Sequence, residues 1–419
     1  MRTLVRSAAL LLTTVLSLGV GACSSDGQQS QTGTTPQSDE AIEILSYWVG
    51  PGEAEALQAL LDVHRKMYPT ERVYNGGIVT GTQERVTVDE RLAKNDPPDL
   101  FQYNAYVLKA FIAANPGKVA PLDDLIAENG LRDEIVPEIL DNVTVDGHVY
   151  AMPVNAHREN SLFYNMQIFK DNGLTPPTTQ EEFLSVCAKL KKKGIPAVAV
   201  STSQGWIITR LFNELALGSM GGQAFSDYYS GSAPLDEAAM GKAIDVLDDV
   251  LTNYINADAN GDGFGWDSAA KEVFDGKAAM FLHGDWAKAY FVQLGWVPDV
   301  DFGVVASPGA TDVFLYGVDV FGLPVGAKDP SGAQDFLRTI GSIDGQVAFN
   351  SIKGSSPMRL DAPLAKFDLM AREVLQSFKT ARLRLPVEGK NVWDDAMVAY
   401  AASHDKAALI QVFKDNPPG

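Results

Sequence analysis

Three of the six tryptophans occur where the chain is expected to turn, next to polar residues. Trp48 precedes the turn Gly50-Pro51-Gly52, Trp266 follows the polar, glycine-rich run 262–265, and Trp286 follows Gly284-Asp285. Ligand pockets combine aromatic side chains with a few convergent polar groups, so these three are candidates to stack on a bound molecule. Packing in a core is the alternative for each of them. It is the favoured interpretation for the other three tryptophans, Trp206, Trp296 and Trp393.

Three charged residues, described in turn below, could each have either a binding role or a structural role. Asp319 lies inside the apolar run 318–321, where a carboxylate requires a ligand or a hydrogen-bond partner such as the backbone. Lys353 lies in the polar run 350–357 and is either a binding residue or, like most lysines, a solvated one. Glu53 opens a predicted helix, where an acid also stabilises the helix dipole. Charged groups form the stronger hydrogen bonds to a polar ligand, so all three are candidate binding residues.

Sequence motifs for metal or catalytic chemistry are incomplete or absent. The run Asp258-x-Asn260-x-Asp262-Gly263 matches the start of an EF-hand calcium loop, but Ala269 stands where the bidentate Glu is required. A turn-rich loop is therefore the simpler interpretation. The five histidines have no metal-ligand spacing, and HExxH, GxSxG and P-loop motifs do not occur in the sequence. We expect no metal and no cofactor.

The elements that position these residues alternate between helices and short apolar strands. Residues 42–48 read as a strand, and 53–67 as a helix with leucines on one face. Further predicted elements are a helix that a Thr178/Glu181 capping box opens and that runs to Lys191, a buried strand at 197–200, a helix at 236–254, a strand at 314–323 and a helix at 332–349. This alternation predicts an α/β fold, and a length of about 380 residues after the N-terminal segment favours two domains.

The N-terminus has the layout of an exported, anchored protein. Arg2 and Arg6 precede an apolar run at 7–20 that is shorter than a membrane-spanning helix. The sequence Val20-Gly21-Ala22-Cys23 resembles the bacterial lipobox, in which the cysteine is lipidated. We expect a signal peptide at 1–22 and a lipidated Cys23 with a flexible tether to residue 40, on the outer face of the cell membrane. The other cysteine, Cys187, is expected in a core.

The net charge of −19 excludes some partners. So acidic a chain repels nucleic acid and anionic lipid surfaces. The membrane link must therefore come from the anchor.

Several phrases occur in the order and spacing of one known family. In chain order they are PPDLF at 97–101, GHVYAMP at 147–153, LFYN at 162–165, NGLTPPTTQEEF at 172–183, FDGKAAM at 274–280 and GDWA at 284–287. Together they resemble the extracellular solute-binding proteins of carbohydrate ABC importers, the group that includes maltose-binding proteins. The resemblance runs from about Ile42 to the C-terminus. The phrases YWVGPGE at 47–53, FQYN at 101–104 and VNAHR at 154–158 are most similar to the glucose- and galactose-type binders.

The resemblance implies a periplasmic-binding-protein-like α/β fold, with two α/β lobes, several hinge crossovers and a ligand cleft between the lobes. The implied N-lobe is 41–153 plus 321–356, the C-lobe is 155–318 plus 359–419, and the hinge lies near 153–158, 317–321 and 356–359. Arg85 and Asn104 match polar positions of the family, and Glu53 matches its glutamate. The predicted ligand-binding set is Trp48, Glu53, Arg85, Asn104, Trp266, Trp286, Asp319 and Lys353.

The implied function is capture of a small neutral sugar, with a monosaccharide preferred, by lobe closure and delivery to the permease subunits of the importer. The protein would act as a monomer and not as an enzyme. The same fold binding an oligosaccharide is one alternative. A glycerol-phosphate-type ligand is another, and it would call for clustered basic residues in the cleft. A secreted glycoside hydrolase would need two carboxylates about 5–10 Å apart.

Overall fold

The computed structural model describes residues 41–77, 81–128, 130–256, 259–261, 263–386 and 391–418, all within the compact unit Glu40–Gly419. The predicted signal peptide, Cys23 and the tether lie outside the described residues, as do Asp258 and Asp262 of the calcium-loop-like run. Within the described part, no helix combines the length and apolar character needed to cross a bilayer.

A five-stranded sheet forms the centre of the first lobe. Its strand order is β2 (Arg72–Asn75), β1 (Ala41–Leu45), β3 (Leu100–Asn104), β12 (Asp319–Gly322) and β6 (Ala151–Pro153). Strands β1, β2 and β3 are parallel, whereas β12 runs antiparallel to β3 and β6. The antiparallel register of β12 and β3 places Asp319 opposite Asn104.

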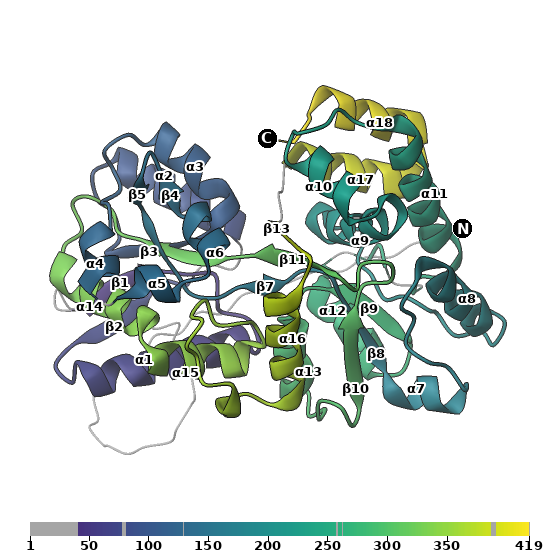
Figure 1. Ribbon diagram of the computed structural model, residues 1–419, viewed down its shortest axis with the longest axis horizontal. Coiled ribbons are helices and arrows are strands. Elements are labelled where there is room, and N and C mark those ends of the chain that lie inside the picture. Colours follow the sequence, from purple (N-terminus) through teal and green to yellow (C-terminus); the bar gives the residue numbers. More distant parts are fainter. Residues whose placement is uncertain are drawn as a thin grey trace, which may run out of the picture. The chain divides into compact units, whose positions relative to one another are not determined.

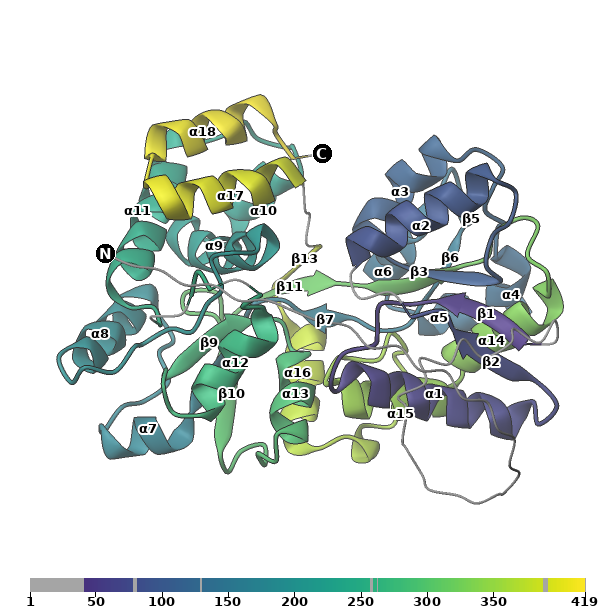
Figure 2. The same ribbon diagram turned by 180° about the vertical axis from the view of Figure 1, so that it is seen from behind.

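Helices cover both faces of this sheet. Figures 1 and 2 show α1, α14 and α15 on one face and α2 and α3 on the other. The helices of this lobe are α1 (Glu53–Met67), α2 (Gly81–Ala93), α3 (Ala105–Ala114), α4 (Asp123–Glu128), α5 (Leu131–Glu134), α6 (Pro137–Asn142), α14 (Pro330–Gly341) and α15 (Ile343–Lys353), with a small ribbon of β4 (Thr144–Val145) and β5 (His148–Val149).

The second lobe is built on a three-stranded antiparallel sheet. Its order is β10 (Phe302–Ala306), β8 (Ser161–Asn165) and β9 (Met280–His283). Leu162 and Phe163 belong to different hydrophobic clusters, because successive strand residues point to opposite faces. The helices are α7 (Met166–Asp171), α8 (Gln180–Lys191), α9 (Gly205–Met220), α10 (Gly222–Tyr229), α11 (Glu237–Asn253), α12 (Trp266–Phe274), α13 (Ala287–Gln293), α17 (Asn391–Ser403) and α18 (Lys406–Asp415).

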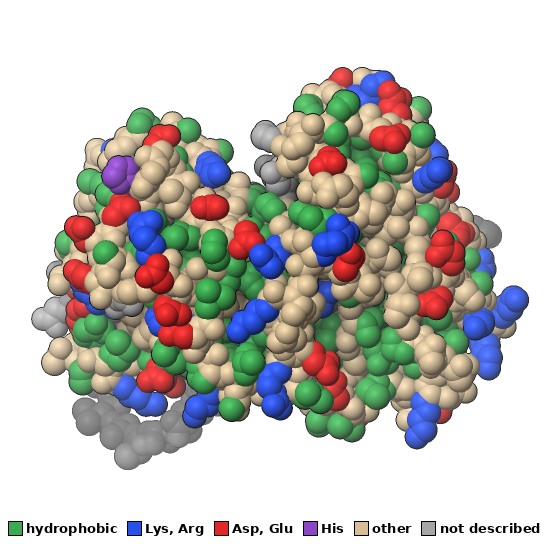
Figure 3. All heavy atoms as spheres, in the orientation of Figure 1, with side chains coloured by type: hydrophobic (Ala, Val, Ile, Leu, Met, Phe, Trp, Pro, Cys, Tyr) green, Lys and Arg blue, Asp and Glu red, His purple; other side chains and the backbone are tan. Residues whose placement is uncertain are grey.

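A second three-stranded sheet lies where the chain passes between the lobes. It consists of β13 (Leu383–Pro386), β11 (Val313–Gly317) and β7 (His157–Arg158), and it is accompanied by a 3-10 helix (Leu364–Lys366) and α16 (Leu369–Thr380). The surface in Figure 3 is hollowed at its upper edge, between α3 and α6 on one side and α10 and α17 on the other.

The predicted hinge segment 153–158 is hydrogen-bonded to each of the other two, 317–321 and 356–359. The backbone N–H groups of Ala156 and Ser356 each donate to the other residue's carbonyl, at 2.8 and 2.9 Å. The Val154 N–H donates to the Asp319 carbonyl at 2.8 Å. Each lobe has its own hydrophobic core, but Phe314 and Phe378 pack with the first core although they fall in the predicted C-lobe. The lobe boundaries stay a prediction.

Most predicted elements occur, with several local corrections. The strand predicted at 314–323 divides at Val318 into β11 and β12, and the helix predicted at 332–349 divides at Ser342, which caps α15. The buried segment 197–200 pairs only through single bridges of Val198 with Ile255 and Met280. Cys187 is buried in α8, as expected.

The capping box of α8 lies one residue later than predicted. Thr179, not Thr178, is the N-cap, and its hydroxyl accepts a hydrogen bond from the Glu182 N–H at 3.2 Å. Glu182, not Glu181, completes the box, because its carboxylate accepts from the Thr179 N–H and also from the Thr178 hydroxyl. Both threonines therefore contact Glu182. The spacing Thr-Thr-Gln-Glu-Glu alone does not decide which threonine and which glutamate form the capping box.

Candidate ligand-binding site

Asp319 is buried and surrounded by side-chain donors. Its carboxylate accepts hydrogen bonds from the Tyr47 hydroxyl at 2.6 Å and from the side-chain amides of Asn104 and Asn155 at 3.0 Å each. The fourth partner is Nε2 of His157, also at 3.0 Å. Asp319 is therefore a buried acid whose partners lie within the protein, but these partners are side chains and not the backbone groups that the alternative interpretation named.

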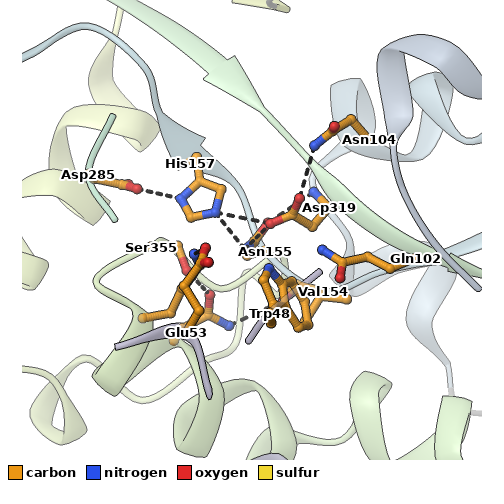
Figure 4. A network of polar contacts seen from close by, with 12 residues as sticks. Trp48, Glu53, Gln102, Asn104, Val154, Asn155, His157, Asp285, Asp319 and Ser355 are labelled. Carbon is orange, nitrogen blue, oxygen red and sulfur yellow. Dashed lines mark hydrogen bonds and ion pairs between the residues drawn. The ribbon is translucent and has the colours of Figure 1, made fainter. Parts of the chain in front are cut away.

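His157 connects Asp319 to the second lobe (Figure 4). Its Nδ1 lies 2.5 Å from Oδ1 of Asp285, whose other oxygen accepts from the Arg158 N–H at 2.7 Å. Asp285 lies between β9 and α13 of the second lobe, whereas Asp319 begins β12 of the first. One imidazole ring on the crossover strand β7 thus contacts a carboxylate of each lobe.

The pKa shifts in this network follow from burial and from the neighbouring charges. Burial alone would lower the pKa of His157, but Asp285 and Asp319 outweigh burial and raise it. Burial alone would raise the pKa of Asp319, but the hydrogen bond and charge of His157, with the charge of Lys353, lower it strongly. The raised pKa of His157 favours its protonated form between the carboxylates of Asp285 and Asp319.

Glu53 and Lys353 form an ion pair beside this network. The Lys353 ammonium contacts the Glu53 carboxylate, and the lysine side chain is only 2% exposed. The interpretation of Lys353 as a solvated lysine is therefore wrong. Gly354 follows it with φ +85, and a Cβ there would lie 3.0 Å from the Asp285 carbonyl oxygen. Only glycine suits that conformation and that close approach.

The aromatic side chains of the second lobe gather around His283. Trp266 stacks on its ring at a centroid distance of 5.7 Å, and Trp286 meets it edge-on at 4.9 Å. Burial and the charge of Arg210 keep the pKa of His283 well below its usual value, so this ring is neutral. A Cβ on Gly284 would lie 1.9 Å from the Trp286 ring, so glycine is needed for the indole to fold back over its own loop.

Trp286 also joins the aromatic group to the polar network. Its ring lies 5.0 Å from the ring of His157, at an angle of 81°. An aromatic platform from the second lobe and the acceptors and donors around Asp319 from the first lobe therefore meet at His157. This combination can bind a molecule that has an apolar face and polar edges.

The structure brings six of the eight predicted residues into this site. They are Glu53, Asn104, Trp266, Trp286, Asp319 and Lys353. Arg85 lies on α2, and its charge acts on Asp394 at the start of α17. Trp48 is 1% exposed and packs on Phe349 and Phe321, at centroid distances of 4.4 and 5.8 Å. Its indole N–H is buried and meets no acceptor within the described ranges.

Four residues of the network were not among the predicted binding residues. They are Tyr47, Asn155, His157 and Asp285. Asn155 and His157 lie in the predicted hinge segment 153–158, and Asp285 directly precedes a predicted tryptophan. The sequence feature that could have identified Asn155 and His157 is their polarity within the predicted crossover segment.

Other candidate sites are weaker. Among the described residues, no group of three or more His, Cys, Asp or Glu side chains could hold a metal ion. A surface cavity of the second lobe is lined by residues of α11, α17 and the segment 255–260, and it shares no residue with the network around His157.

Comparisons with known proteins agree with this architecture. Residues 74–347 match the family described as bacterial extracellular solute-binding protein. A Pyrococcus horikoshii chain named as an ABC transporter extracellular-binding protein is 31% identical over 387 residues, which cover 90% of this chain and 84% of that one. A Rhizobium meliloti chain named "Probable sugar-binding periplasmic protein" is 30% identical over 356 residues, 83% of each chain.

The fold also matches a solved structure. The structure of a chitin oligosaccharide binding protein has a TM-score of 0.76 to this chain at 20% identity, and the match covers 90% of this chain and 97% of the other. At that identity the likeness concerns the fold.

The pairing of His157 makes stability depend on pH. Because its pKa is raised, the pairing contributes fully below the unfolded-state pKa of about 6.5 and is lost as the pH rises through the folded-state value. His157→Gln should therefore lower the free energy of unfolding by about 3 kcal/mol near pH 6, and by progressively less as the pH is raised through the folded-state pKa of His157. Urea unfolding across this range measures the difference.

His148, an exposed histidine beside Asp123, provides the control. His148→Gln should change the free energy of unfolding by less than about 0.5 kcal/mol at every pH. A loss in His157→Gln that does not vary with pH would contradict the charged bridge.

Proposed function

The chain belongs to the bacterial extracellular solute-binding proteins, and on that premise we propose that it captures a small neutral sugar between its lobes and delivers it to the permease subunits of an ABC importer. Relatives in this family are named as sugar-binding and as ABC transporter binding proteins. The observation that carries the proposal is the meeting of Trp286 with the His157–Asp319 network, since it joins an aromatic platform and a polar rim from two lobes.

A neutral ligand is favoured because the charges of the site are paired internally. Glu53 pairs with Lys353, and His157 pairs with both Asp285 and Asp319. A phosphate-bearing ligand would have to displace these partners to reach Lys353. Hydroxyl groups, in contrast, can bond to paired charges without changing the charge balance.

We assign the following contacts to the bound sugar. Trp266 and Trp286 would stack on its apolar face, and Glu53, Asn104, Asp319 and Lys353 would bond its hydroxyls. Arg85 on α2 and the core-packed Trp48 lie outside this group, and we assign them no contact with the sugar. Within this proposal a monosaccharide is preferred over an oligosaccharide. The site would bind and release its ligand unchanged, so the protein would not be an enzyme.

Loss of either half of the site should abolish most of the affinity. Trp286→Ala removes the platform, and Asp319→Asn replaces a charged acceptor with a neutral one, so each should weaken binding about tenfold or more. Calorimetry with the best ligand from a panel of D-glucose, D-galactose, D-xylose and maltose measures this. Affinity within about twofold of wild type in both variants would contradict the assigned site.

Stability must be measured alongside affinity, because Asp319 and Trp286 are 3% and 9% exposed. Trp296→Ala is the matched control: Trp296 stacks on Phe291 and Phe302, which are not among the assigned ligand contacts, so this variant should lose stability but keep its affinity. Solution scattering of wild type should show a smaller radius of gyration with the sugar, since the ligand contacts both lobes only when they close. Chromatography of the sugar after incubation should show no product.

We also propose that the protein is exported and acts as a monomer held at the cell membrane by acyl chains on Cys23. Cys23→Ser should release it into the soluble fraction, since the acidic chain has no attraction to anionic lipid. Cell fractionation and fatty-acid labelling measure the outcome. A variant that stays in the membrane and still takes up label would refute the anchor.

A further inference from the structure

Arg210 on α9 is placed between two tryptophans. Its guanidinium carbon lies 5.5 Å from the ring centroid of Trp206 and 5.0 Å from that of Trp286. A guanidinium over an indole face is attracted by the ring quadrupole, and its planar shape stacks well there. The two rings come from α9 and from the loop before α13, so the position of Arg210 is fixed by two elements.

Buried acidic residues neutralise part of the charge of the guanidinium. Arg210 forms an ion pair with Glu159, which is 5% exposed, and Glu214 is buried nearby with the Ser307 hydroxyl bonded to it. Burial lowers the pKa of Arg210, whereas Tyr106, Asp394 and Glu214 act in the opposite direction. An arginine keeps its proton under such conditions, so the group is a fixed, partly neutralised cation.

The guanidinium is not used up by these contacts. Both Nε and Nη1 are buried without a hydrogen bond in the part of the chain that the structure describes, Nη1 although it is ion-paired with Glu159, and the side chain keeps 19% of its area exposed. An arginine whose only task was to neutralise Glu159 would be expected to satisfy its donors there. A planar donor group therefore remains at the ring that also contacts His157.

We propose that Arg210 is a ligand-binding residue that determines specificity, donating hydrogen bonds to hydroxyls of the sugar that stacks beside Trp286. The proposal rests on the proposed function and extends it. A sugar stacked beside Trp286 would lie near two polar groups. One is the acceptor Asp319, which is hydrogen-bonded to His157, and the other is the donor Arg210, which lies over the Trp286 ring. The planar guanidinium suits two adjacent hydroxyl oxygens, so the ligand class is a sugar with a free vicinal diol at that edge.

The test separates ligand binding from charge neutralisation. Arg210→Gln alone leaves Glu159 buried without its partner and is expected to lower the melting temperature. The double variant Arg210→Gln/Glu159→Gln removes both charges and should recover most of that loss. If Arg210 binds the sugar, the double variant should still bind the best sugar of the panel about tenfold or more weakly.

Arg338→Gln is the matched control, because Arg338 pairs with Glu128 and Asp335 on helices of the first lobe, and its affinity should equal that of wild type. Deoxy analogues of the bound sugar give a second readout. Wild type should discriminate against the analogue that lacks the hydroxyl bonded to Arg210, and Arg210→Lys should lose that discrimination.

Two results would overturn the proposal in distinguishable ways. Binding by the double variant within about twofold of wild type would show that Arg210 only balances Glu159, while the proposed function stands. A wild-type protein that binds no sugar of the panel would refute the proposed function, and this inference with it.

Discussion

The carboxylates of Asp285 and Asp319 are buried on either side of a single imidazole ring. Two ionised groups in a low-dielectric interior repel each other, and each costs several kcal/mol when it has no partner. The cation of His157 offsets both at once. The positions of three segments, the loop before α13, the crossover strand β7 and the start of β12, therefore depend on one shared interaction.

The rest of the site is built outward from that interaction. Asp285 fixes the loop that presents Trp286, and Gly284 leaves the space that its ring requires. Asp319 accepts hydrogen bonds from Tyr47, Asn104 and Asn155, which come from three separate segments of the chain. The ion pair of Glu53 and Lys353 lies beside it, and Gly354 passes close to Asp285. Aromatic platform and polar rim are thus positioned by the same crossover at which lobe movement would occur.

The elements were largely predictable because periodicity and capping are local properties. The helices at 53–67 and 237–253 follow from their apolar spacing and, for the second, from the Asp236 cap. The sequence analysis did not predict the division of the 332–349 helix at Ser342, although Gly341 followed by Ser342 is a helix-ending glycine next to an N-cap residue. The capping box shifted by one residue because two threonines and two glutamates offered equivalent spacings.

The candidate site was predictable in its types of residue but not in its connections. Asp319 stood out because a lone acid in an apolar strand needs a partner, yet the partner, His157, is 162 residues away in sequence. Arg210 gave no signal, since one arginine in an amphipathic helix is usually a solvated residue. Trp206, assigned to packing, and Trp286, assigned to binding, contact the same guanidinium. Such pairings depend on tertiary contacts that spacing alone does not encode.

The central claim is that His157 carries a proton between two carboxylates, and the ring can be observed directly. Nitrogen-15 NMR of the imidazole near pH 6.5, with His157→Gln to assign the signals, reports the protonation of both ring nitrogens. An unperturbed histidine is about half protonated at this pH. The account predicts that His157 is predominantly protonated there and titrates only at higher pH. A neutral ring with one bare nitrogen at pH 6.5 would contradict it.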